Sequence, residues 1–160
     1  MSARSLLIGL IMTVPALGLG PVLAFDPTSP APVNVEKSGV GLKGYDPVGY
    51  FNAGQPVEGD PTITVVHDGT LYAFESEANR DAFVVDPERY LPAYGGFCAL
   101  GMSFGKKVDI DPNAWKIVDG KLYVQANSRA AELWQKDVSG NISKADGTWP
   151  VVMNKAPNDL

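Results

Sequence analysis

Hydrophobic and polar residues alternate in two separate segments of the chain, 62–74 and 115–125, and both segments are rich in β-branched and aromatic residues. An Asp-Gly pair divides each segment, Asp68-Gly69 in the first and Asp119-Gly120 in the second. Alternation with a period of two is typical of a β-strand, and Asp-Gly favours a two-residue turn in which both residues have positive φ. The pattern therefore predicts two β-hairpins.

A helix is expected after each hairpin. Ser76 can cap the first helix by accepting a backbone N–H bond, and the apolar positions of that helix share one sector: Ala78, Ala82 and Phe83. Asn127 can cap the second helix, whose apolar positions recur at spacings of three, four and eight: Ala130, Leu133, Trp134 and Val138. Two hairpin-plus-helix units of this kind predict an α+β fold.

A further turn of helix is expected from Asp86-Pro87 through Tyr90, because Asp suits the cap position and Pro suits the first helical position. The chain after the second helix, from Ser139 to Leu160, is polar. Only Trp149 and Val151-Val152 are expected to anchor it to the core.

The two hairpin-plus-helix units match one another at a constant shift of 51 residues. The matched positions are Asp68, Gly69, Leu71, Tyr72, Phe83 and Asp86 with Asp119, Gly120, Leu122, Tyr123, Trp134 and Asp137. A shared ancestor explains this match, and so do the common demands of two tight turns and two strands. On either interpretation, the sequence predicts two units packed around the segment that joins them.

That joining segment is a glycine-rich loop. Residues 94–105 hold four glycines, three aromatic residues, Met102 and the only cysteine of the chain, Cys98. Glycines permit backbone conformations that other residues avoid, and the aromatic side chains supply packing surface, so the loop is expected to be buried and shaped. Since Cys98 cannot form an internal disulfide, it is expected to be buried as a small hydrophobe, bound to a metal, paired with another molecule, or reactive.

Residues 1–24 have the pattern of a secretory signal peptide. A basic residue, Arg4, precedes an apolar run that ends in the small-residue stretch Val22-Leu23-Ala24. Pro15, Pro21 and three glycines interrupt the run, which disfavours a membrane anchor. We expect cleavage after Ala24 and export to the periplasm or the exterior.

The remaining 136 residues are enough for one modest domain. We expect a proline-rich linker at 25–40, a domain at 41–150 and a C-terminal tail at 151–160. The mature chain carries 12 Lys and Arg against 18 Asp and Glu, a net charge of −6, because Arg4 is the only charged residue removed. This charge argues against nucleic acid and anionic membrane surfaces as partners, and leaves a metal ion or another protein.

Several short motifs occur together over roughly residues 41–150. The first unit contains Asp46-Pro47-Val48, the stretch 67–76, Phe83 and the stretch 86–90, and this combination resembles the YHS domain. Residues 94–105, 111–115 and 119–123 resemble the extension found in an exported branch of YHS-domain proteins. The resemblance implies a module related to treble-clef metal-binding domains. Metal-associated YHS domains are found beside copper-transport ATPases.

The chain departs from that family at the metal-binding thiols. The corresponding positions hold Gly49, Glu75 and either Asn79 or Ala78. A tetrahedral zinc site of four Cys or His ligands cannot be formed from one Cys and one His, so we expect no structural zinc site of the family type.

A copper site is the specific metal hypothesis. Cys98 and Met102 are four residues apart, a spacing that places two sulfurs on one helical face, and thiolate with thioether suits Cu(I). His67 is the third candidate ligand if the first hairpin lies near the loop. The structural alternative is that Cys98 and Met102 fill core space and His67 is a hydrogen-bonded strand residue.

Cys98 and His67 also form a candidate nucleophile–base pair, in which the imidazole would activate the thiol. No recognisable enzyme motif surrounds Cys98. The sequence therefore favours an exported, non-catalytic binding module over a small thiol enzyme or redox protein. A ligand pocket with aromatic walls and polar tips is a further option, with these candidate residues: Tyr45, Tyr50, Tyr72, Tyr90, Tyr94, Trp115, Tyr123 and Trp134.

Overall fold

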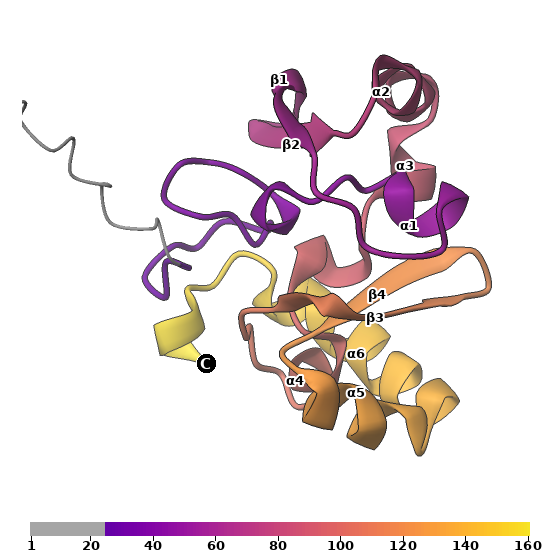
Figure 1. The fold of residues 1–160 in the computed structure, drawn as a ribbon. Coiled ribbons are helices and arrows are strands. Elements are labelled where there is room, and N and C mark those ends of the chain that lie inside the picture. Colours follow the sequence, from indigo (N-terminus) through magenta and orange to yellow (C-terminus); the bar gives the residue numbers. More distant parts are fainter. Residues whose placement is uncertain (1–24) are drawn as a thin grey trace, which may run out of the picture.

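The computed structural model describes residues 25–160, and the predicted signal peptide, residues 1–24, lies outside the described residues (Figure 1). The fold is α+β, as predicted, with two antiparallel two-stranded sheets and helices beside each. The first unit contains a 3₁₀ turn η1 (Leu42–Gly44), then α1 (Gly49–Asn52), β1 (Asp60–His67), β2 (Thr70–Phe74), α2 (Glu77–Val85) and α3 (Pro87–Tyr90). The second contains η2 (Ala93–Gly96), α4 (Ala99–Ser103), β3 (Asp111–Val118), β4 (Lys121–Gln125), α5 (Ser128–Gln135) and α6 (Val138–Val152), and a last 3₁₀ turn η3 (Pro157–Asp159) follows.

Both predicted hairpins are confirmed. Strand β1 pairs with β2 and β3 pairs with β4, each in antiparallel register. Asp68 and Gly69 have φ of 47° and 78°, and Asp119 and Gly120 have φ of 49° and 76°. Positive φ at both central residues identifies each turn as the type that matches the twist of a two-stranded ribbon.

The repetition with a shift of 51 residues extends beyond the matched residue types. Every Cα pair of the β1–β2 ladder has its counterpart in the β3–β4 ladder, including an irregularity between Asp60 and Thr64 that recurs between Asp111 and Trp115. The turns before the short helices α1 and α4 correspond as well, since Lys43 has φ of 53° and Tyr94 φ of 54°. The repeat therefore spans residues 42–90 and 93–141.

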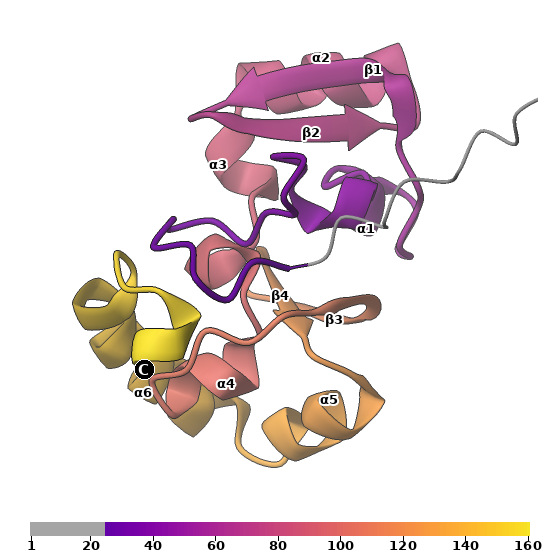
Figure 2. The same cartoon turned by 90° about the vertical axis from the view of Figure 1, so that its left-hand side faces the viewer.

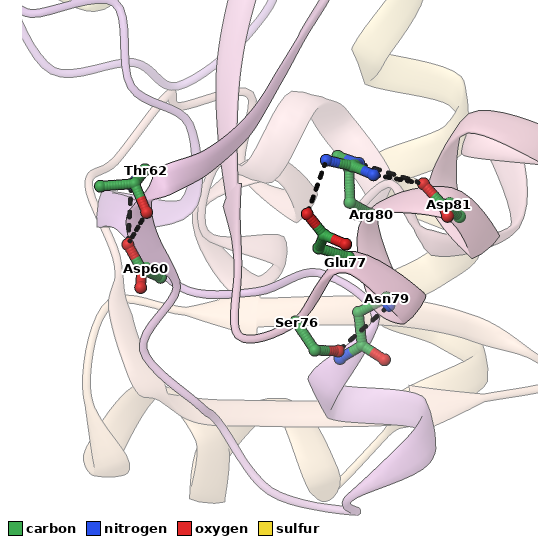
Figure 3. Close-up of polar contacts among 7 residues, drawn as sticks. All are labelled: Asp60, Thr62, Ser76, Glu77, Asn79, Arg80 and Asp81. Atoms are coloured by element: carbon green, nitrogen blue, oxygen red, sulfur yellow. Dashed lines mark hydrogen bonds and ion pairs between the residues drawn. The ribbon is translucent and has the colours of Figure 1, made fainter.

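The predicted helix caps are also found. Ser76 Oγ accepts a hydrogen bond from Asn79 N at 3.2 Å, which Figure 3 shows at the start of α2. Asn127 Oδ1 accepts from Ala130 N at 2.9 Å at the start of α5. Helix α3 begins at Pro87 as expected, although the Asp86 side chain makes no capping bond.

The C-terminal part differs from the prediction. The second helix ends at Gln135 instead of continuing to Val138, because Asp137 leaves the helical conformation, with φ of −151° and ψ of 70°, and its Oδ1 accepts a hydrogen bond from Gly140 N at 3.0 Å. A new helix of 15 residues, α6, starts there. Its apolar residues recur at helical spacing and face the core, in the order Val138, Ile142, Ala145, Trp149 and Val152.

Three clusters of buried side chains make up the core. We call them the first-unit cluster (Val48, Tyr72, Phe74, Phe83 and Tyr90), the junction cluster (Leu42, Tyr50, Cys98, Ile110, Leu122, Val124 and Ala130) and the second-unit cluster (Ala93, Tyr94, Phe97, Ala99, Met102, Tyr123, Trp134, Ala145 and Val152). Figure 2 shows β1, β2 and α2 at one end of the molecule and α4, α5 and α6 at the other. The predicted apolar sectors are only partly buried, since Ala78 and Leu133 face solvent.

Segments 25–40 and 151–160, expected as linker and tail, are held against the body. Lys107 is 4% exposed, and its ammonium donates to the carbonyl oxygens of Ala31 at 3.0 Å, Met153 at 2.6 Å and Lys155 at 2.7 Å. Asn158 N donates to Pro27 O at 3.0 Å. The two ends of the described chain are therefore joined through the Lys107 side chain and through this backbone bond. Within residues 25–160, no helix combines the length and apolar character needed to cross a membrane.

Candidate functional site

A cavity of about 370 Å³ opens between the two units. Tyr72 on β2 and Tyr123 on β4 both line it, and these two residues are equivalent at the shift of 51. Residues 91–95, which run from the connection into the start of the second unit, supply another part of the wall, and Trp149 on α6 supplies a further part. The repeat and the connection between its halves thus create the cavity together.

Aromatic rings form much of the lining. Tyr72, Tyr94 and Tyr123 are each less than 10% exposed. The Tyr94 ring lies between two others, with its centroid 5.9 Å from that of Tyr123 and 6.2 Å from that of Trp149. Tyr94 holds a left-handed backbone conformation, and Gly95 after it has φ of 60°. A Cβ on Gly95 would overlap the carbonyl group of Pro32, so a tight turn with glycine at this position shapes the wall.

Charged groups stand among these rings. Glu88, Lys121 and Asp146 line the cavity. Asp146 Oδ1 accepts a hydrogen bond from the Tyr94 hydroxyl at 2.9 Å, whereas Glu88 and Lys121 form no ion pair with any residue of 25–160. Burial raises the pKa of Tyr94, and the nearby Asp146 carboxylate raises it further. The pKa of Tyr123 is raised by burial and then by Asp146, so both phenols stay protonated near neutral pH.

The Tyr123 hydroxyl lies at this wall and makes no side-chain hydrogen bond with another described residue. The Tyr123 residue is 8% exposed, but its hydroxyl is not one of the buried side-chain atoms that lack a partner, so the oxygen itself is accessible. The hydroxyl is therefore available to a molecule in the cavity.

The three predicted metal ligands occupy different places. Cys98 caps α4, and Met102 follows it on the same helix, with Met102 N donating to Cys98 O at 2.9 Å. The two side chains nevertheless pack into different clusters, Cys98 into the junction cluster and Met102 into the second-unit cluster. His67 ends β1 and stacks edge-on against Phe83 with centroids 5.7 Å apart.

The contacts of the Cys98 thiol are internal. Cys98 is 2% exposed, its Sγ accepts from Gly101 N at 3.4 Å, and its S–H donates to Gln125 Oε1 at 3.5 Å. His67 Nε2 has no hydrogen-bond partner and lies 3.6 Å from Asp68 Oδ2. Among the described residues, no group of three or more His, Cys, Asp and Glu side chains is placed to hold a metal. The Cu(I) site of Cys98, Met102 and His67 stays a prediction.

Three positions that the sequence analysis compared with YHS thiols, Gly49, Glu75 and Asn79, come together at the Asp46 carboxylate, which that analysis named only as part of a motif. Asp46 is fully buried, and its Oδ1 accepts from Val48 N at 2.8 Å and Gly49 N at 3.2 Å. Its Oδ2 accepts from Glu75 N at 2.9 Å and from Asn79 Nδ2 at 2.7 Å. This one side chain joins the start of α1 to the end of β2 and to α2. The available signal was Asp46-Pro47, because an Asp before a turn often accepts bonds from the following N–H groups.

Gln125 has a comparable role in the second unit. It ends β4, is 1% exposed, and its Oε1 accepts from Leu100 N at 3.0 Å as well as from the Cys98 thiol. A buried polar side chain therefore connects a strand to a short helix in both units. In the first unit this side chain, Asp46, precedes the helix α1, and in the second unit it is Gln125, at the end of the strand β4.

Comparison of the chain with protein-family models, with curated proteins and with solved structures found no match. The cavity between the units, with its aromatic walls and unpaired hydroxyl, is the feature of the described residues that best supports a function.

Proposed function

We propose that this protein is an exported, non-catalytic binding module of the YHS type that holds a small molecule in the cavity between its two units. The cavity itself carries the proposal. Its volume of about 370 Å³ suits a small organic ligand. Its walls combine aromatic surface with a few polar groups, among them the unpaired Tyr123 hydroxyl, which is the usual make-up of a ligand site.

Two features favour binding over turnover. The lining of the cavity contains neither Cys nor His, so the candidate nucleophile and base of the sequence are not part of it. The Cys98 thiol is engaged by Gln125 Oε1 and Gly101 N, and it is 2% exposed. A thiol that acts as a nucleophile needs access to its substrate.

Export is part of the proposal and has its own test. The residue that follows the expected cleavage site, Phe25, packs edge-on against Phe97 with centroids 6.4 Å apart. Mass spectrometry of the protein from its native source should give Phe25 or a close neighbour as the first residue. Protein recovered from the cytoplasm with an uncleaved N-terminus would contradict export.

Calorimetric titration with three small probes tests the binding function: 2-phenylethylammonium, 2-phenylethanol and 3-phenylpropanoate. At least one should bind with a Kd below about 1 mM. Leu91→Trp and Val33→Trp, which fill the cavity from two segments, should abolish binding, whereas Leu133→Trp on the exposed side of α5 should retain it. Mass spectrometry of the recovered probes should show them unchanged.

Two results would overturn this function. One is the absence of binding by all three probes to the folded native chain. The other is binding that persists in both cavity-filling variants, because the ligand would then lie elsewhere. Circular dichroism of each variant establishes that it is folded before its titration is interpreted.

A further inference from the structure

We propose that the cavity selects organic cations, such as a primary or methylated amine on an apolar body. This inference rests on the proposed function and names the chemical class of its ligand. It follows from three properties of the lining: the balance of charge, the aromatic faces, and the contact of one of these rings with the ammonium of Lys107.

The charge balance favours a cation. The lining holds two carboxylates, Glu88 and Asp146, against one ammonium, Lys121. The Tyr94 hydroxyl occupies one Asp146 oxygen, Oδ1, and no described residue donates to Oδ2. Residues 25–160 have a net charge of −6, so the field outside the cavity also attracts cations.

The aromatic walls add a second attraction. The faces of Tyr and Trp rings carry partial negative charge, and a cation held over them is stabilised most where water is excluded. Tyr72, Tyr94, Tyr123 and Trp149 all line the cavity, three of them buried. An uncharged or anionic ligand of the same shape would gain the apolar contact without this attraction.

Trp149 already attracts an ammonium inside the protein. The Lys107 Nζ lies 6.0 Å from the centroid of the Trp149 ring and 5.0 Å from that of Phe97. Trp149 thus contacts a buried cation and lines the cavity at the same time. The contact shows that this ring accepts an ammonium near its face, although Lys107 itself is not part of the lining.

The probes differ only in their polar end, so their relative affinity measures the preference for charge. We expect 2-phenylethylammonium to bind about tenfold more tightly than 2-phenylethanol, and 3-phenylpropanoate to bind most weakly. The advantage of the cation should shrink as salt is raised, because Glu88 and Asp146 are both exposed and therefore accessible to counter-ions.

Charge variants give opposite expected effects. Asp146→Asn and Glu88→Gln should each lower the affinity for 2-phenylethylammonium at least threefold and leave the affinity for 2-phenylethanol unchanged. Lys121→Gln should raise the affinity for 2-phenylethylammonium, because it removes a like charge. Glu75→Gln and Lys116→Gln are matched controls, because both side chains are exposed and outside the cavity. A general loss of stability would not produce changes of opposite sign.

Three outcomes separate this inference from the proposed function. Equal affinity for all three probes, lost in Leu91→Trp, would overturn the cation preference and leave the binding function standing. Cation binding that persists in both cavity-filling variants would overturn the inference as well, because the cation would then bind at the surface and not in the cavity. No binding by any probe would overturn both.

Discussion

The Cys98 thiol donates a hydrogen bond to Gln125 Oε1 and accepts one from Gly101 N. A group so enclosed reacts with a solvent reagent only when the structure opens locally. We expect iodoacetamide to alkylate Cys98 in the folded protein on the order of 100-fold more slowly than in the denatured protein. Intact mass against time measures both rates. A folded-state rate equal to or above the denatured rate would instead support the thiol-enzyme alternative.

The copper hypothesis is tested on the same residue. Reduced protein is titrated with Cu(I) against a competing chelator, beside Cys98→Ser. If Cys98 is a ligand, Cu(I) affinity falls in the variant, since a thiolate is lost from the ligand set. Binding that is absent, or equal in the two proteins, would remove this site and leave Cys98 as part of the junction cluster.

Asp46 should matter more to stability than any surface carboxylate. Asp46→Asn keeps one carbonyl oxygen but places an NH₂ group opposite two donors, Glu75 N and Asn79 Nδ2. We expect a loss of about 3 kcal/mol in the free energy of unfolding, because buried N–H groups would lose a charged acceptor. Urea denaturation measures this change.

Two variants calibrate that result. Asn79→Ala removes one of the four donors and should cost about 1–2 kcal/mol. Asp60→Asn should leave the unfolding midpoint close to that of the native protein, since Asp60 is exposed and Asn can still accept from Thr62 N. If Asp46→Asn behaved like Asp60→Asn, the role assigned to the buried carboxylate would be wrong.

At the scale of elements, the parts that could be predicted are those whose cause is local. Asp-Gly demands positive φ at both positions, and Ser76 or Asn127 satisfies the N–H three residues later, so hairpins and helix starts follow from short stretches. Helix α6 was missed because Gly140, Gly147 and Pro150 lower helix propensity. Packing of its apolar stripe against α4 and η2 outweighs that cost.

The cavity could not be located from sequence for a different reason. Tyr72, Tyr94, Tyr123 and Trp149 were available as residue types, and three of the four were among the aromatic candidates. Their meeting depends on how the two units pack, which no local pattern encodes. The same holds for Asp46, because two of its donors, Glu75 N and Asn79 Nδ2, lie about thirty residues away in the chain.

Two glycines with positive φ should respond differently to substitution. Around Gly120 the space for a Cβ is open, so Gly120→Ala should cost only the conformational strain, about 1 kcal/mol. Gly95→Ala adds an overlap with the backbone of Pro32 and should cost at least about 3 kcal/mol. Thermal and urea denaturation of the two variants measure the difference. Equal losses would show that segment 25–40 yields to the new methyl group.

For the whole molecule, Lys107 joins parts of the chain that are far apart. Burial lowers the pKa of Lys107, while its three carbonyl acceptors favour the charged form, and no carboxylate among the described residues pairs with it. Lys107→Met should fill the same space but leave three carbonyl groups without their donor. We expect a loss of about 2–4 kcal/mol in the free energy of unfolding.

Limited proteolysis with mass spectrometry should locate the effect of that substitution. New cleavage is expected in segments 25–36 and 153–160, which lose their common anchor. Lys106→Met is the control, because the neighbouring Lys106 is exposed. A Lys107→Met protein whose two ends resist protease as the native protein does would contradict the anchoring role.

The bonds of Lys107 and Asn158 also govern when the fold can be completed. A polypeptide emerges from the ribosome N-terminus first, so residues 27–31 exist long before residues 153–158, which hold them in place. Residues 27–31 therefore gain these bonds only after residues 153–158 have been made. For the export that we propose, this order delays the closure of the two segments until residue 158 has crossed the membrane.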